Sequence, residues 1–168
     1  RKGFYEGWVA ESIAREMSLG GGLISLDDLK LYESVWRDPI RTSYRGYDIW
    51  SMGPPSSGGI LIAQILNMLE PFNLGAMGWG SARLTHLVVE SERRAYADRS
   101  VHLGDSDFWE VPTAKLMDVK YARERMKDFD PERATLSRGL AAGQWADESE
   151  DTTHYSLIDK DGMMVAIT

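Results

Sequence analysis

The stretch that decides the fold is "TTHYSLIDKDGMMVAIT", residues 152–168. In an extended strand, successive side chains point to opposite faces. One face then carries Thr152, His154, Ser156 and Ile158, and the other carries Thr153, Tyr155 and Leu157. Asp161 and Gly162 supply the left-handed backbone geometry that a tight turn requires, and a second apolar run follows them. The stretch therefore predicts a β-hairpin that begins at a pair of threonines.

An acidic segment with little periodicity leads into this hairpin. Residues 137–151, "SRGLAAGQWADESED", consist largely of small, acidic and flexible residues. Such a segment buries too little apolar surface to pack firmly. The sequence therefore predicts a flexible linker over residues 137–151 that ends at the first threonine of the hairpin.

The chain before the linker is predicted to be mainly helical. A helix over residues 3–18 is expected to stop at Gly20, Gly21 and Gly22, which free the backbone from helical geometry. Ser25 and Asp28 form a capping box ahead of a short helix. Around the turn Arg45–Gly46, polar residues alternate with aromatic or branched ones, which predicts two strands.

Two longer helices follow these strands. Residues 60–71, "ILIAQILNMLEP", are apolar almost all round, which predicts a buried helix that Pro71 ends. The longest helical pattern covers residues 81–102. It places Leu84, Leu87, Val88 and Ala95 on one side and a surface rich in Glu and Arg on the opposite side. Weaker helical patterns follow over residues 113–128.

Composition limits the possible functions. The chain has 168 residues, of which 43% are apolar, enough for about one domain with a real core. A net charge of -7 without a basic cluster argues against a nucleic-acid partner. The absence of cysteine excludes disulfides, thiolate metal sites and a cysteine nucleophile. Because the chain opens inside a helical pattern and stops inside an apolar run, we expect it to be a piece of a longer polypeptide.

A possible metal-binding spacing occurs at the end of the long helix. Asp98 and His102 are four residues apart on one helix face, and Asp105 and Asp107 lie just beyond. The sequence has no second helical ligand of the H-E-x-x-H type. We therefore favour a structural interpretation, in which Asp98 and Arg99 pair with neighbours while the other two aspartates shape a turn.

Two further polar features have ordinary structural explanations. Ser56 and Ser57 lie in the glycine-rich turn "GPPSSGG", but the stretch lacks the G-x-S-x-G order of a nucleophile elbow. A proline turn followed by a serine-capped helix explains it. His86, on the long helix, is expected to be a packed or surface residue and not a ligand.

Five stretches of the chain match a known family in that family's own order. They are "GFYEGWVAESI", "GGLISLDDLKLY", "YRGYDIWSMGPPSSGGILIAQILNMLE", "RRAYADRSVHLGD" and "TTHYSLIDKDG". In these stretches the sequence resembles the gamma-glutamyltranspeptidase family of N-terminal nucleophile hydrolases, over nearly the whole chain. The resemblance implies an α+β fold, part of a four-layer αββα sandwich whose central sheet receives the hairpin.

The resemblance also implies that the chain is cut. The family makes one precursor that cleaves itself before the first Thr of the T-T-H segment, which here falls between Asp151 and Thr152. Residues 1–151 would then be the C-terminal part of the large subunit, and residues 152–168 the start of the small subunit, which together form a heterodimer. An uncharged residue such as Gln or Gly is expected before the scissile bond in many relatives. Asp151 departs from that pattern, and its carboxylate either assists ester hydrolysis or slows processing.

By resemblance, the mature protein is a gamma-glutamyltransferase and glutathione hydrolase. Thr152 would attack the γ-glutamyl amide of glutathione or a related compound, and the acyl group would pass to water or to an amino acid or peptide amine. The oxyanion hole and the substrate-binding residues are expected outside this chain, no cofactor or metal is expected, and a periplasmic or extracellular location is suggested. The alternatives are a related acylase, such as a cephalosporin acylase or a poly-γ-glutamate depolymerase, and a noncatalytic homologue that stays uncut.

The role of Thr152 also has a physical rationale. A threonine hydroxyl is a weak nucleophile that needs a base within hydrogen-bond reach. If cleavage makes Thr152 a chain terminus, its own α-amino group, with an ordinary pKa of about 7.7 to 8.0, can be that base. Without the resemblance, Thr152 would be interpreted as an ordinary threonine at the start of a strand.

Overall fold

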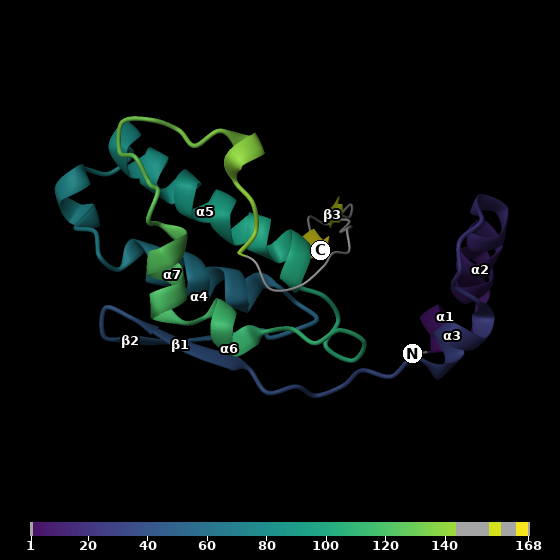
Figure 1. The fold of residues 1–168 in the computed structure, drawn as a ribbon. Coiled ribbons are helices and arrows are strands. Elements are labelled where there is room, and N and C mark those ends of the chain that lie inside the picture. Colours follow the sequence, from purple (N-terminus) through teal and green to yellow (C-terminus); the bar gives the residue numbers. More distant parts are fainter. Residues whose placement is uncertain (1, 144–154, 159–163, 168) are drawn as a thin grey trace. The chain divides into compact units, whose positions relative to one another are not determined.

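The computed structural model describes residues 2–143, 155–158 and 164–167 (Figure 1). It divides into two compact units, Arg1–Arg37 and Asp38–Thr168, and each is described by itself. Helices and paired strands both occur, so the chain is α+β, as the sequence predicts. None of the helices in the described part of the chain has the length and apolarity needed to cross a membrane.

The first unit contains α1 (Lys2–Tyr5), α2 (Trp8–Gly20) and α3 (Leu26–Leu31). The prediction of one helix over residues 3–18 is wrong, because the extended backbone of Gly7 separates α1 from α2. The glycine stop is confirmed: Gly21 is left-handed, with φ 73°, and its backbone N–H donates to the carbonyl of Met17.

The predicted capping box at the start of α3 is confirmed. The Asp28 N–H donates to Ser25 Oγ over 3.2 Å, and the Ser25 N–H donates to Asp28 Oδ2 over 2.8 Å. The side-chain and backbone hydrogen bonds from Ser25 lower the pKa of the Asp28 carboxyl. Two free amide groups at the helix terminus are therefore satisfied by side chains from the same turn.

The second unit begins with the hairpin of β1 (Ile40–Tyr44) and β2 (Tyr47–Ser51). The two strands are antiparallel, with Ile40 opposite Ser51 and Tyr44 opposite Tyr47. Arg45 and Gly46 both have positive φ, 50° and 85°, which is the geometry of a tight two-residue hairpin turn. The predicted strands and their turn are thus confirmed.

Helix α4 (Gly58–Leu69) forms the centre of the second unit and contacts β1, β2, α5, α6 and α7. Figure 1 shows α4 and α5 (Ala82–His102) running side by side. The remaining elements are η1 (Leu74–Met77), α6 (Thr113–Leu116), α7 (Val119–Arg125) and η2 (Ser137–Gly139). The prediction that α4 is buried is confirmed for most of its length, since Ile60, Ala63 and Met68 are almost fully enclosed.

A second antiparallel hairpin pairs β3 (Tyr155–Ile158) with β4 (Met164–Ile167). Tyr155 lies opposite Ile167 and Ile158 lies opposite Met164. The hairpin predicted in residues 152–168 is therefore present in its strands. Its predicted turn at Asp161 and Gly162 lies outside the described residues.

The predicted division of α5 into an apolar side and an opposite charged side is wrong. Leu87 and Ala95 are buried as expected, but Glu90 and Arg94 are buried beside them. Glu90 and Arg94 are four residues apart, so their side chains lie on the same face of the helix. The charges are tolerated there because they pair with each other and with polar groups from later in the chain.

Gly59 marks a close approach between α4 and the first hairpin. A Cβ at this position would overlap the Met52 carbonyl oxygen, which accepts the Gly59 N–H, and would press on the side chain of Ile40. We expect Gly59→Ala to destabilise the protein by about 1–3 kcal/mol, the usual cost of overpacking. Gly58→Ala is the matched control, because a Cβ there meets Ser56 Oγ at an ordinary 3.5 Å. Thermal unfolding of both variants checks this, and equal melting temperatures would contradict it.

Candidate functional site

A stripe of buried polar side chains on α5 is the main feature of the site region. We define the α5 stripe as Glu90, Arg94, Asp98 and His102, which recur every four residues. Each is at most 1% exposed. Ionised groups in such surroundings are destabilising unless they are paired and hydrogen-bonded. The partners of the stripe therefore determine what it does.

The N-terminal half of the stripe is an ion pair. Arg94 Nη1 lies 2.6 Å from Glu90 Oε2, and Arg93 Nη1 lies 2.5 Å from Glu90 Oε1. Arg94 also donates through Nη2 to Asp128 Oδ1 over 2.8 Å and through Nε to the Arg125 carbonyl over 2.7 Å. The guanidinium of Arg94 thus joins α5 to the end of α7.

Glu90 also holds the chain that follows α7. Both the backbone N–H and the hydroxyl of Thr135 donate to its carboxylate, over 3.2 and 2.6 Å. Burial alone would raise the pKa of the Glu90 carboxyl, but the hydrogen bonds from Thr135, Arg94 and Arg93 outweigh it and lower the pKa to about 2. Glu90 is therefore a structural carboxylate that stays ionised, not a general acid or base at neutral pH.

The C-terminal half of the stripe centres on Asp98. Its Oδ2 accepts from Gln64 Nε2 over 2.5 Å and from the Tyr121 hydroxyl over 2.8 Å. Its Oδ1 lies 3.1 Å from Arg125 Nη2 and accepts the backbone N–H of Gly143 over 2.9 Å. Burial and the Asp98 charge together raise the pKa of the Tyr121 phenol, so Tyr121 remains a donor.

His102 binds the carbonyl group of Gly143, the residue whose N–H donates to Asp98. Its Nε2 lies 2.6 Å from the Gly143 carbonyl oxygen. Because a carbonyl oxygen only accepts hydrogen bonds, Nε2 carries the proton and donates. Trp109 Nε1 donates in turn to the backbone carbonyl of His102 over 3.2 Å. The backbone N–H and C=O of Gly143 are thus both bound by side chains of α5.

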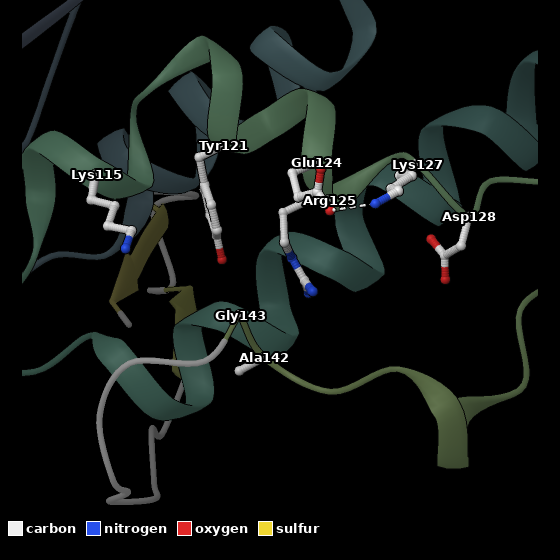
Figure 2. Close-up of a pocket in the computed structure, with 8 residues that line it drawn as sticks. All are labelled: Lys115, Tyr121, Glu124, Arg125, Lys127, Asp128, Ala142 and Gly143. Carbon is white, nitrogen blue, oxygen red and sulfur yellow. Dashed lines mark hydrogen bonds and ion pairs between the residues drawn. The ribbon is translucent and has the colours of Figure 1, made fainter.

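An open pocket of about 570 Å³ lies beside this contact. Its lining is Lys115, Tyr121, Glu124, Arg125, Lys127, Asp128, Ala142 and Gly143. Figure 2 shows the Tyr121 and Arg125 side chains pointing from α7 toward the chain at Ala142 and Gly143. Tyr121 donates a hydrogen bond to Asp98 and Arg125 pairs with it, so both side chains help to orient the carboxylate that binds Gly143.

Comparison with known proteins identifies the relatives of this chain. A sequence model of the gamma-glutamyltranspeptidase family matches residues 1–168. The chain belongs to the gamma-glutamyltranspeptidase family. It is 49% identical over 166 residues to the glutathione hydrolase proenzyme of Escherichia coli (strain K12), an alignment that covers 98% of this chain and 29% of that protein.

Two other similarities bear on function. The chain is 43% identical over 165 residues to the acylase ACY 1 proenzyme of Pseudomonas sp. (strain V22), covering 98% of this chain and 29% of that protein. The crystal structure of Helicobacter pylori gamma-glutamyltranspeptidase matches with a TM-score of 0.73 and 46% identity over 84% of this chain and 41% of that one. The chain thus spans less than a third of the two curated relatives.

The residues that the family resemblance marks for chemistry are Asp151 and Thr152. Both lie outside the described residues. The flanking segments are described: Gly143 precedes Thr152 by nine residues, and β3 begins three residues after it. Within the linker that the sequence predicts over residues 137–151, Ser137–Gly139 form the η2 turn and Gly143 binds α5.

The metal-binding spacing on α5 does not assemble a metal site. Asp98 and His102 both bind Gly143, while Asp105 Oδ1 accepts the Asp107 N–H and shapes a turn. Arg99 Nε donates to Ser57 Oγ over 3.0 Å. These contacts agree with the structural interpretation. Within the described residues, no group of three or more His, Asp or Glu side chains could hold a metal ion.

The serine pair has a structural role that differs in detail from the expected cap. Ser57 is the N-cap residue of α4 by position, but its hydroxyl makes no capping bond and instead accepts from Arg99. The Gly58 N–H donates to Ser56 Oγ over 3.3 Å. His86 is packed, as expected, with Nε2 2.9 Å from the Asp130 carbonyl oxygen.

Sequence reasoning missed Gly143, Tyr121 and Arg125. Glycine and alanine around position 143 indicate only flexibility, and the two α7 residues are ordinary members of a short helix. The available signal was the series of ionisable residues spaced by four on α5. That spacing is also typical of an exposed helix face, so burial had to be known first.

The pKa of Glu90 yields a prediction of pH dependence. Its folded-state pKa of about 2 lies below the ordinary 4.5, so its ionised form stabilises the fold above about pH 4.5 and loses this effect as pH falls toward 2. We expect Glu90→Gln to lower the melting temperature of the full-length protein at neutral pH, because buried Arg94 keeps Asp128 but loses the other of its two charged partners, a cost of up to about 3–5 kcal/mol. The difference from wild type should shrink as pH falls from about 5 to 2.

Glu92→Gln is the control for this measurement. Glu92 lies on the same helix and is exposed, so its replacement should change the melting temperature little at any pH. Parallel melting curves for wild type and Glu90→Gln across the acid range would contradict a stabilising Glu90 carboxylate.

Proposed function

We propose that the full-length protein containing this chain is a self-processing gamma-glutamyl transferase and hydrolase. It cleaves the γ-glutamyl amide of glutathione and related compounds through a threonyl acyl-enzyme. The observation that carries the proposal is the family match over residues 1–168, which includes the T-T-H segment. The similarity to a glutathione hydrolase proenzyme supports the substrate class and the cleavage.

Processing begins with the hydroxyl of Thr152 and the carbonyl carbon of Asp151. Attack by the oxygen forms a tetrahedral intermediate, and its collapse breaks the C–N bond while the nitrogen takes up a proton. The chain is then joined through an ester, which water hydrolyses to give a carboxylate at Asp151 and a free α-amine and hydroxyl at Thr152. The Asp151 side chain either assists this hydrolysis or slows it.

Turnover uses the groups that processing releases. The α-amine of Thr152, with an ordinary pKa of about 7.7 to 8.0, is partly neutral near pH 7 to 8 and can take the proton of the attacking hydroxyl. Thr152 attacks the γ-glutamyl carbonyl, the amide C–N bond breaks, and the proton passes to the leaving amine. Water or an acceptor amine then releases the glutamyl group. General-base assistance of this kind is worth about 10²- to 10⁴-fold in rate.

The two products of processing are proposed to remain together. Residues 1–151 supply the C-terminal part of the large subunit, and the β3–β4 hairpin belongs to the first segment of the small subunit, residues 152–168. We propose that this hairpin enters the central sheet of a four-layer αββα sandwich. The similarity to the Helicobacter pylori enzyme structure supports this architecture, and the word proenzyme in the relatives' names supports a cut precursor.

An acylase is the second candidate function. The 43% identity to an acylase ACY 1 proenzyme favours it, because that protein shares the same stretch of chain. Both candidates use an N-terminal nucleophile and differ in the acyl group that they bind. Cleavage alone does not separate them, so substrates must be compared.

Thr152→Ala in the full-length protein tests both steps of the proposal. We expect wild type to yield two chains on a denaturing gel, and Thr152→Ala to remain one band and to release no chromophore from a γ-glutamyl anilide. Thr153→Ala is the matched control, because it removes the neighbouring hydroxyl and should still permit cleavage. A wild-type precursor that stays whole would refute self-processing.

Substrate comparison then separates the two candidates. The processed enzyme should release chromophore from the γ-glutamyl anilide faster than it hydrolyses a glutaryl-cephalosporin or a poly-γ-glutamate chain. Preference for either of the latter two would replace the glutathione assignment while leaving the threonine mechanism in place.

A further inference from the structure

The binding of Gly143 by α5 is unusually complete for a residue that precedes a predicted linker. Its N–H donates to Asp98 Oδ1 over 2.9 Å, and its C=O accepts from His102 Nε2 over 2.6 Å. Both residues are completely buried. These two directional bonds hold the two peptide groups that flank the Gly143 Cα, so they fix the orientation of the residue as well as its position. We call this arrangement the Gly143 anchor.

The anchor is itself held rigidly. Gln64 from α4 and Tyr121 from α7 donate to the second oxygen of Asp98, and Arg125 lies 3.1 Å from the first. Contacts from two other helices, α4 and α7, therefore orient the carboxylate that binds Gly143. A carboxylate supported in this way keeps a fixed orientation.

The place of the anchor along the chain suggests its purpose. Thr152 follows Gly143 by nine residues, so the proposed scissile bond stays within about 30 Å of the anchor even if the chain is fully extended. On the other side of that bond, β3 begins at Tyr155. The proposed scissile bond thus lies between a residue held by α5 and the first strand of the hairpin.

We propose that Asp98 and His102 are positioning residues for self-processing, which act by fixing the start of the segment that carries the Asp151–Thr152 bond. This inference rests on the proposed function. In this proposal, neither residue contacts the reacting atoms. Their effect is to limit the conformations of the segment, so that the scissile peptide spends more time in the geometry that the Thr152 hydroxyl can attack.

The size of the effect follows from the next attachment upstream. Among the described residues, the next side-chain contact upstream of Gly143 is that of Ser137, whose Oγ accepts from Arg93 over 3.1 Å and which lies 15 residues before Thr152. The probability that a segment holds its ends in one arrangement falls roughly as the −3/2 power of its length. Lengthening the distance along the chain from the last held residue to Thr152 from nine to 15 residues therefore predicts processing that is about twofold slower.

The test compares two replacements of His102 in the full-length precursor. His102→Gln keeps an N–H donor near the position of Nε2, whereas His102→Met has a similar length and no donor. Because His102→Met keeps the bond from the Gly143 N–H to Asp98, we expect it to be processed more slowly than wild type by up to about twofold, and His102→Gln to recover most of the rate. The appearance of the two chains is followed over time on a denaturing gel.

Hydrogen exchange reports on the anchor independently of cleavage. In His102→Met, the amides of residues 137–143 should exchange faster than in wild type, and in His102→Gln they should remain protected. If exchange is unchanged in His102→Met, His102 does not hold Gly143. If exchange rises while the processing rate stays at the wild-type value, the anchor exists but does not position the bond.

A second variant leaves the core untouched. Insertion of about six Gly and Ser residues between Gly143 and Gln144 preserves every contact of the anchor but lengthens the segment as much as loss of the anchor would. It should slow processing by about twofold, and an unchanged rate overturns the inference. A wild-type precursor that is never cut refutes the proposed function itself, whereas equal rates in wild type and variants refute only the role of the anchor.

Discussion

The burial of three charges on one face of α5 is the constraint on which the second unit depends. Glu90, Arg94 and Asp98 are almost completely enclosed, and ionised groups are costly there without partners. Partners within the helix satisfy only some of these charges, through the ion pairs of Glu90 with Arg93 and Arg94. The other partners come from α4, from α7 and from the chain that follows α7. Satisfying these charges therefore dictates the course of the backbone between Tyr121 and Gly143.

This constraint connects the core to the region of proposed chemistry. The packing of α4 on α5 places Gln64 against Asp98, and Asp98 in turn binds the backbone of Gly143. A displacement of α4 relative to α5 would therefore alter the position of Gly143 through two hydrogen bonds, from Gln64 to Asp98 and from Gly143 to Asp98. Each of these hydrogen bonds joins groups with a defined geometry.

Features that depend on neighbouring residues could be predicted from the sequence. The Ser25–Asp28 capping box, the Arg45–Gly46 turn and the glycine stop after α2 all follow from local backbone chemistry. The face of α5 that packs could not be predicted, because charges spaced by four also describe an exposed helix. The binding of Gly143 depends on residues 41 and 45 positions earlier, and no local pattern encodes that contact. Thr152 was identified through family resemblance, since its own surroundings indicate only a strand.

Replacing the α5 stripe with apolar residues would not preserve its function, even where it preserved stability. Buried ion pairs often contribute no more stability than well-packed apolar side chains of similar volume. An apolar face, however, binds any chain of suitable shape, and it tolerates a shift of one residue along that chain. The Gly143 anchor does not, because Asp98 requires an N–H and His102 requires a C=O at fixed positions. If the protein cuts itself at one particular peptide bond, as we propose, directional polar contacts specify which residue lies at the start of the segment, and apolar burial does not.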